Sequence, residues 1–285
     1  MSTHRSSVPL IPRRHLAGIP VGQMRARRRG RGLDLVGARP YRAGDDIRTI
    51  DHRASARLSS ASGDDQLLVR EYLTEESARV VVVIDRSPSM GLFPSRLPWL
   101  SKPDALREAV RVILDSATDA HCLAGMLDCR SPHRWLAPDG RTSADELGET
   151  AASSTFDAPA GALDHGLRSM LEIERGLHSG TFVFVISDFI NPPEASVWEA
   201  MLARHWDVVP VVTQDPVWEK SFPAVAGALL AVADPQTGST STVRLTEHEV
   251  GERRAANEAR IEALGARFRS LGLDTVEVPV SDPAE

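Results

Sequence analysis

From residue 78 onward, short apolar runs alternate with longer segments in which apolar residues recur every three or four positions. The apolar runs predict buried strands at residues 79–84, 121–127, 181–186, 207–212 and 275–280. The longer segments predict helices at residues 104–118, 164–175, 194–204 and 247–271. Strands and helices in alternation are typical of an α/β fold, in which helices cover both faces of a mostly parallel sheet.

The chain before residue 78 differs in character. Residues 1–32 are rich in Pro, Gly, Ser and Arg without a sustained period, and we predict a flexible basic segment there. Residues 33–77 interleave Gly, Asp and Arg closely, and we predict an ordered collar that packs on the acidic remainder of the chain. The main domain then spans residues 78–285, with an inserted hairpin at residues 213–245.

Charge is distributed unevenly along the 285 residues. Residues 1–72 hold 14 Arg and 7 acidic residues, whereas the remainder holds 19 basic and 32 acidic residues. The Arg cluster at residues 25–31 contains no aromatic side chain that could stack on a base, which weighs against nucleic-acid binding. No apolar run approaches the roughly 20 residues that cross a bilayer, and residues 1–14 lack the apolar segment of a secretory signal, so we expect a cytoplasmic protein without a membrane span.

A carboxylate and two hydroxyls follow the first buried strand of the main domain. Asp85, Ser87 and Ser89 occupy alternate positions where the chain leaves that strand, so their short side chains can point at one centre. Hard oxygen ligands of this kind suit Mg²⁺ or another divalent cation. The alternative is a loop that caps a helix, because Ser and Asp are also the preferred N-cap residues.

A hydroxyl and a carboxylate also follow a second buried strand, because Ser187 and Asp188 come directly after residues 181–186. In an open parallel sheet, ligands bind at the carboxyl ends of the strands where the strand order reverses. If the two strands are neighbours, Asp85 and Asp188 face each other across that crevice. We therefore predict one metal site formed by Asp85, Ser87, Ser89 and Asp188.

These motifs together resemble the von Willebrand factor A-like fold with its metal-ion-dependent adhesion site (MIDAS). A more specific resemblance, to the bacterial domain-of-unknown-function 58 family, extends over about residues 30–280. It is carried by the Asp85 motif, Val69-Arg70-Glu71-Tyr72, and the series Gly37, Tyr41, Gly44, Asp45, Asp46, Arg48, Asp51, Ser55 and Arg57. The chain departs from the family pattern at His52, where Trp is usual, and near Gly161, where the adhesion-site threonine is expected.

The resemblance implies a von Willebrand factor A-like, Rossmann-like domain that binds proteins and catalyses no reaction. Members of the family are thought to act beside MoxR-type AAA+ ATPases in the chaperone-like assembly or activation of client proteins. The implied cofactor is Mg²⁺ or another divalent cation, and the implied partners are a MoxR-like ATPase and a client protein.

Two enzyme classes fit the residues less well. A phosphoaspartyl enzyme with Asp85 as nucleophile would need a second Asp two positions on, where this chain has Ser87. A serine hydrolase would need the G-x-S-x-G elbow, which surrounds neither Ser87 nor Ser89. We expect a non-enzymatic, metal-assisted binding protein, with a Mg²⁺-dependent hydrolase or phosphatase and a metal-free scaffold as the alternatives.

Overall fold

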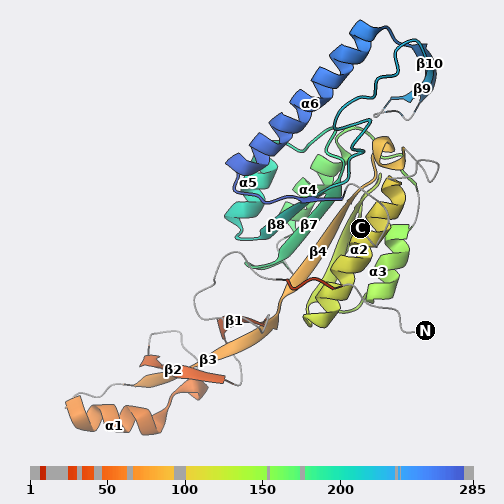
Figure 1. Ribbon diagram of the computed structural model, residues 1–285. Coiled ribbons are helices and arrows are strands. Elements are labelled where there is room, and N and C mark those ends of the chain that lie inside the picture. The colour runs from red at the N-terminus through yellow and green to blue at the C-terminus, as the bar shows by residue number, and fades with distance from the viewer. Residues whose placement is uncertain are drawn as a thin grey trace. The chain divides into compact units, whose positions relative to one another are not determined.

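The computed structural model describes residues 7–10, 25–30, 34–41, 47–62, 67–92, 101–152, 155–173, 177–234, 237 and 239–278. The chain divides into a main domain, Met1–Arg14 with Arg79–Glu285, and an N-terminal unit, His15–Ala78. Figure 1 labels helices and strands of both. No helix in the described ranges is both long enough and apolar enough to span a bilayer.

The main domain is built on a six-stranded sheet with the order β11-β8-β7-β4-β5-β6. Its strands are β4 (Arg79–Asp85), β5 (Leu123–Cys129), β6 (Arg134–Leu136), β7 (Phe182–Ser187), β8 (Asp207–Val212) and β11 (Val276–Glu277). All neighbours pair in parallel except β5 and β6. The chain moves outward from β4 through β5 to β6 and then returns to β7 on the other side of β4. The strand order therefore reverses between β4 and β7.

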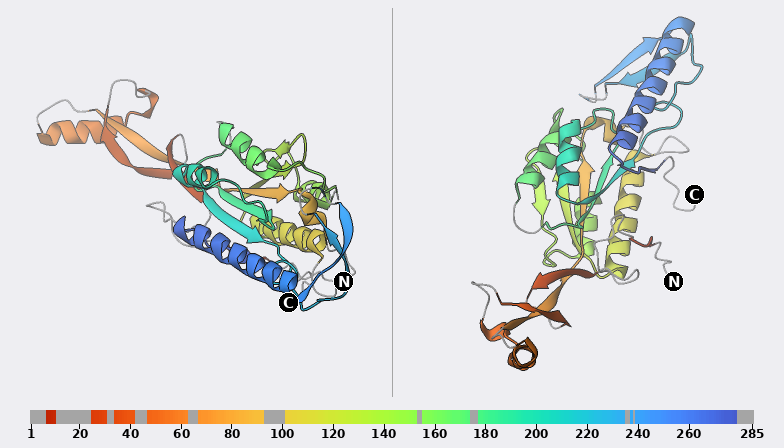
Figure 2. Two further views of the ribbon diagram at one scale, coloured as in Figure 1. Left: turned by 90° about the horizontal axis from the view of Figure 1, so that it is seen from above. Right: turned by 90° about the vertical axis from the view of Figure 1, so that its left-hand side faces the viewer.

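Helices cover both faces of this sheet, as the views in Figure 2 show. They are α2 (Lys102–Asp119), α3 (Ala144–Ala152), α4 (Ala162–Glu172), α5 (Ala195–Ala203) and α6 (Glu247–Ser270). Val81 and Val83 of β4 share a buried cluster with α4, α5 and α6. Because successive side chains of a strand point to opposite faces, Val80, Val82 and Ile84 face the other side, where α2 packs against β4.

The sequence prediction of a mostly parallel α/β sheet is confirmed, and α2, α4, α5 and α6 lie within three residues of their predicted bounds. The predicted hairpin is also present: β9 (Leu229–Ala233) pairs antiparallel with β10 (Thr240–Arg244). The last strand is shorter than predicted, at two residues in place of six. The three-residue strand β6 and the nine-residue helix α3 gave no sequence signal long enough to predict them.

The N-terminal unit contains a three-stranded antiparallel sheet in the order β1-β3-β2. Its elements are β1 (Arg25–Gly30), β2 (Asp34–Pro40), the 3-10 helix η1 (Ile47–Thr49), α1 (His52–Ser62) and β3 (Leu68–Ser77). Strand β1 lies inside the segment that we predicted to be flexible, and the unit begins near residue 15 instead of 33. An Arg-rich run has no hydrophobic alternation to signal a strand, yet its backbone groups can pair with β3 all the same.

Candidate functional site

The loop after β4 brings the three residues of the D-x-S-x-S motif onto one turn. Asp85 ends the strand, and its Oδ1 accepts a hydrogen bond from the backbone N–H of Ser87 at 2.8 Å. The hydroxyl oxygens of Ser87 and Ser89 lie 3.0 Å apart. Pro88 begins the 3-10 helix η2 (Pro88–Gly91), which turns the backbone between the two serines. The motif therefore places the two serine hydroxyls side by side and ties the Asp85 carboxylate to the same turn.

The neighbouring strand contributes Ser187 directly to this group. Strands β4 and β7 pair with Ile84 opposite Ile186, which sets their last residues side by side. The Ser187 hydroxyl donates a hydrogen bond to Asp85 Oδ2 at 2.6 Å, and its oxygen accepts the backbone N–H of Phe189 at 2.9 Å. We predicted that Asp188 would face Asp85. The hydrogen-bond partner that this strand offers Asp85 is Ser187, and Asp188 acts on Asp85 through its charge.

Burial and a neighbouring charge both act on Asp85, whose residue surface is only 5% exposed. Burial raises the pKa of the Asp85 carboxyl to about 6, the negative charge of Asp188 adds to the rise, and hydrogen bonds from Ser187 and Ser87 partly oppose it. The carboxylate is therefore ionised at neutral pH in an environment that disfavours its charge. A cation beside it would relieve that penalty.

Asp188 instead forms an ion pair with a buried lysine, Lys102, which the sequence interpretation did not identify. Its Oδ2 accepts a hydrogen bond from Lys102 Nζ at 2.8 Å, and its Oδ1 accepts the backbone N–H of Ile190 at 3.1 Å. Lys102, the first residue of α2, is fully buried and also donates to Glu219 Oε1 at 2.5 Å and to the Ser89 carbonyl at 3.0 Å. The ammonium group thus connects Asp188, Glu219 and the motif loop.

One sequence signal could have drawn attention to Lys102. The chain has 33 basic residues, of which only Lys102 and Lys220 are lysines. A compact ammonium with three donors differs from a planar guanidinium, so a rare lysine at the start of a helix suggests a site that needs this geometry.

The charge state of this network follows from its contacts. Burial disfavours the Lys102 ammonium, but the negative charges of Asp188 and Glu219 outweigh that effect and raise the pKa of Lys102. Burial also raises the pKa of Glu219, and the charge of Lys102 partly opposes the rise. Lys102 is therefore protonated at neutral pH and acts as a permanent cation within the site.

The segment after β8 supports the network from the other side. Glu219 Oε2 accepts the backbone N–H of Asp215 at 2.8 Å. Asp215 Oδ1 accepts the backbone N–H groups of Val217 and Trp218, both at 2.8 Å, and so fixes the turn. Gln214 donates from its side-chain amide to the Asp188 carbonyl, while its buried Oε1 has no hydrogen-bond partner among the described residues. This segment thus positions Glu219 and holds the backbone of Asp188.

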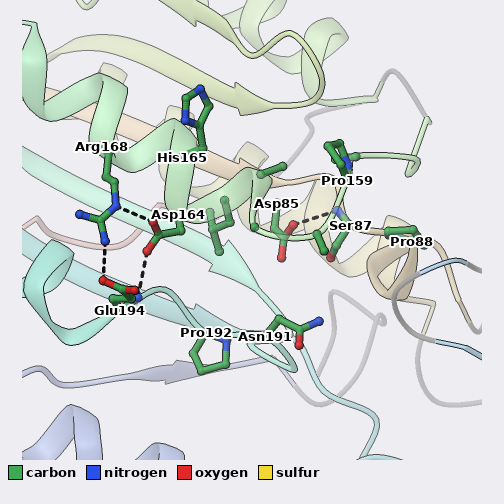
Figure 3. Close-up of a pocket in the computed structure, with 15 residues that line it drawn as sticks. Asp85, Ser87, Pro88, Pro159, Asp164, His165, Arg168, Asn191, Pro192 and Glu194 are labelled. Carbon is green, nitrogen blue, oxygen red and sulfur yellow. Dashed lines mark hydrogen bonds and ion pairs between the residues drawn. The ribbon is translucent and has the colours of Figure 1, made fainter.

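A pocket of about 380 Å³ opens beside the motif loop. Figure 3 shows Asp85 and Ser87 at one side of it and the start of α4 with Asn191 and Pro192 around the remainder. Its polar rim is held by Arg168, which donates to Asp164 Oδ2 at 2.6 Å and to Glu194 Oε2 at 2.7 Å. The Asp85 carboxylate is thus the buried charge that a ligand in this pocket would meet.

The pocket wall lacks the hydroxyl that the adhesion-site resemblance calls for. Residues 158–162 are Ala, Pro, Ala, Gly and Ala, and Gly161 has a φ of +80° at the start of α4. A threonine would be strained at that backbone angle, although the space around it is open. Of the hydroxyl residues shortly before this wall in the sequence, Thr155 is exposed, and Ser153 and Ser154 lie outside the described residues.

Arg86, between the first two motif residues, anchors the loop to the domain. Its guanidinium is 1% exposed and donates to Asp128 Oδ1 at 2.9 Å. It also donates to the carbonyls of Thr150 and Ala151, in the last turn of α3, at 3.0 and 3.1 Å. Since the final carbonyls of a helix lack partners within the helix, one side chain stabilises both the helix end and the motif loop.

The residues at this edge fit a divalent cation only in part. Asp85, Ser87 and Ser89 supply hard oxygen ligands next to an open pocket. Asp188 already has Lys102 on one carboxylate oxygen and Ile190 N–H on the other. Within the described ranges, no three His, Cys, Asp or Glu side chains gather as a metal-binding group. An ion here would therefore depend on serine hydroxyls and water.

The predicted family-motif residues in the N-terminal unit have structural contacts of their own. Asp51 Oδ1 accepts the backbone N–H groups of Arg53 and Ala54 at 3.1 and 3.0 Å, which caps α1. The Ser55 hydroxyl donates to the Asp51 carbonyl and accepts the N–H of Leu68, which ties α1 to β3. The remaining members are Gly37 at a bulge in β2, the exposed side chains Tyr41, Arg48 and Arg57, and Gly44, Asp45 and Asp46, which lie outside the described residues.

The fold and the site define an α/β protein with a buried polar cluster at the carboxyl ends of β4 and β7, where the strand order reverses. The chain belongs to the family described as protein of unknown function DUF58, whose sequence profile matches residues 37–263. No curated protein matches the chain.

Several solved structures are similar to the chain at low sequence identity. Conserved hypothetical protein BatB from Bacteroides thetaiotaomicron is 15% identical with a TM-score of 0.37, covering 69% of this chain and 99% of that one. An aerotolerance-related membrane protein from Bacteroides fragilis is 13% identical with a TM-score of 0.34, covering 68% and 100%. The pilus adhesin SpaC from Lactobacillus rhamnosus GG is 11% identical with a TM-score of 0.41, covering 73% and 29%.

Proposed function

We propose that this protein is a non-enzymatic, metal-assisted binding protein with a von Willebrand factor A-like domain. It acts with a MoxR-type AAA+ ATPase in the chaperone-like assembly or activation of client proteins. The observation that carries the proposal is the meeting of the Asp85 loop and Ser187 at the strand-order reversal, beside an open pocket. Ligands of open α/β sheets bind at this place.

The residues of the site take different roles. Asp85, Ser87 and Ser89 would hold the cation through oxygen atoms, and Ser187 orients Asp85 by its hydrogen bond. Asp188 acts through its negative charge rather than as a free ligand, because Lys102 binds one of its oxygens. When bound, a divalent cation supplies an open coordination position that a carboxylate of a partner protein can fill. The pocket gives that carboxylate access to Asp85.

The same contacts support binding over catalysis. Asp85 accepts hydrogen bonds from Ser87 and Ser187, and these hold it in place as a ligand. A phosphoaspartyl mechanism requires a general acid near the nucleophile, and position 87 offers only a hydroxyl. His165 lines the pocket, but its ring packs edge-on against His133 with centroids 5.6 Å apart. The proposal therefore assigns no catalytic residue.

A pull-down of a MoxR-type ATPase from the same genome tests the proposal. Wild-type protein in Mg²⁺ should retain the ATPase, whereas Asp85→Ala, or wild type with EDTA, should lose most of it. Asp139→Ala is the matched control, because Asp139 is a partly exposed acid on the loop after β6, paired with exposed Arg141. Equal retention by wild type, Asp85→Ala and the chelated protein would reject the metal-bridged mechanism. Absence of retention in every sample would reject the partnership.

A further inference from the structure

Lys102 has a place in the site that the proposed function leaves without a role. Its ammonium is fully buried and has acceptors at Asp188 Oδ2, Glu219 Oε1 and the Ser89 carbonyl, at 2.8, 2.5 and 3.0 Å. An ammonium group has three N–H donors, so these three acceptors match it. The protein therefore carries a cation of its own within the candidate metal site.

This internal cation lies behind the predicted metal ligands. Ser89 binds the Lys102 ammonium through its carbonyl, while its hydroxyl lies 3.0 Å from that of Ser87. Asp188 binds the same ammonium and follows directly on Ser187, the partner of Asp85. Ser89 and Asp188 thus connect the ammonium with the oxygen atoms that face the pocket.

We propose that Lys102 is an internal counter-ion that occupies Asp188 and thereby weakens the binding of a divalent cation at Asp85, Ser87 and Ser89. The inference rests on the proposed metal site and identifies the residue that sets its affinity. A second cation near the ammonium meets electrostatic repulsion, and it gains Asp188 as a ligand only by displacing Lys102.

The same contacts would also allow the domain to fold without metal. If Lys102 were absent, Asp188 and Glu219, which are 1% and 6% exposed, would both be buried without this partner. Buried carboxylates require a compensating charge. Lys102 supplies that charge permanently, so folding and cation binding become separate properties of the protein.

The first test is Lys102→Met in the full chain, which keeps an unbranched side chain and removes the charge. Isothermal titration with MgCl₂ should show binding at least tenfold tighter than in wild type, and the melting temperature should rise more on addition of MgCl₂. Lys220→Met is the matched control. Lys220 is the other lysine of the chain and pairs with Glu277, whose side chain is 59% exposed. Lys220→Met should bind Mg²⁺ as the wild type does.

A second variant, Lys102→Met/Glu219→Gln, separates release of Asp188 from a change in net charge. It removes one charge of each sign, so the net charge of the site equals that of wild type while Asp188 is released. Binding at least tenfold tighter in this variant supports the proposal, and it decides the matter alone if Lys102→Met does not fold. If the double variant binds Mg²⁺ with the affinity of wild type, the proposal is overturned. Any tighter binding by Lys102→Met would then come from the change in net charge and not from the release of Asp188.

The titration also distinguishes failure of the proposed role of Lys102 from failure of the proposed metal site. Tight Mg²⁺ binding by both Lys102 variants, with none measurable in wild type, would support the role of Lys102 and count against metal-assisted binding by the natural protein. Measurable Mg²⁺ binding in wild type with no gain in the double variant would overturn the role of Lys102 and leave the metal site standing.

Discussion

Replacing Arg86 with Met should destabilise the domain more than any exposed substitution, and the reason lies in the groups that Arg86 leaves behind. Asp128 is 1% exposed, and its pairing with Arg86 Nε at 2.9 Å is its closest ion pair. Arg130 is 3.4 Å from the same carboxylate but is itself 32% exposed. The carbonyls of Thr150 and Ala151 would lose a donor as well.

The magnitude follows from these contacts. Breaking a buried ion pair by removing one partner costs about 3 to 5 kcal/mol, because the remaining charge is buried without compensation. The unpaired helix carbonyls act in the same direction. We expect Arg86→Met to lower the free energy of unfolding by about 3 to 5 kcal/mol. Arg141→Met removes an exposed pair with Asp139 and should change it by no more than about 1 kcal/mol.

Denaturant unfolding of a double-mutant cycle measures the coupling directly. Asp128→Leu should be as harmful as Arg86→Met, whereas the double variant should be less harmful than the sum of the two by about 1 to 3 kcal/mol. A loss below about 1 kcal/mol in Arg86→Met, or additive effects in the double variant, would refute the reasoning. The Mg²⁺ response of the folded Arg86→Met protein should also weaken, because Arg86 lies between two of the proposed ligands.

The pKa of Asp85 is about 6 in the folded protein, against an ordinary value of 3.8, so ionising Asp85 disfavours folding, and this penalty grows as the pH rises through that window. In denaturant titrations with EDTA, the free energy of unfolding of Asp85→Asn relative to wild type should therefore increase by about 2 kcal/mol from pH 4.5 to 7.5. A difference that stays constant with pH would contradict this. Asp51→Ala removes the cap of α1 and should lower the free energy of unfolding by about 1 kcal/mol in the same assay, while Arg57→Ala, on an exposed side chain of the same helix, should have little effect. Gly125→Ala would place a Cβ 2.6 Å from the Leu136 carbonyl oxygen and should reduce the melting temperature, whereas Gly148→Ala, with nothing within 4 Å, should leave it unchanged or raise it.

The sequence predicted the central strands well because buried parallel strands are continuous apolar runs that differ clearly from amphipathic helices. Strand β4, with Val80 to Ile84 fully buried, is the clearest example. The edge strand β6 and the Arg-rich β1 lack that signal, since their pairing depends on backbone groups and not on hydrophobic side chains. Periodicity therefore reports burial well and edge pairing poorly.

The candidate site was predictable only as far as local spacing determines geometry. Asp85, Ser87 and Ser89 lie within five residues, so their turn could be inferred from the sequence. The rarity of lysine in the chain draws attention to Lys102, but its contact with Asp188 joins residues 86 positions apart, and the sequence around neither residue identifies the other as its partner. Nor could the sequence show that Ser187, and not Asp188, would meet Asp85.

The charge balance of the site indicates which carboxylate would take up a proton or bind a cation. Asp85, Asp188 and Glu219 carry three negative charges when ionised, and Lys102 supplies one positive charge among them. Unbalanced charge in a buried cluster is unfavourable, so the site favours any process that adds positive charge or a proton. Asp188 and Glu219 both hold the Lys102 ammonium. In the part of the chain that the structure describes, Asp85 is bound by hydroxyl and amide donors alone, and it lines the pocket. Proton uptake and cation binding therefore compete for the Asp85 carboxylate. Acidification below about pH 6 protonates Asp85, which should weaken Mg²⁺ binding and at the same time stabilise the metal-free protein.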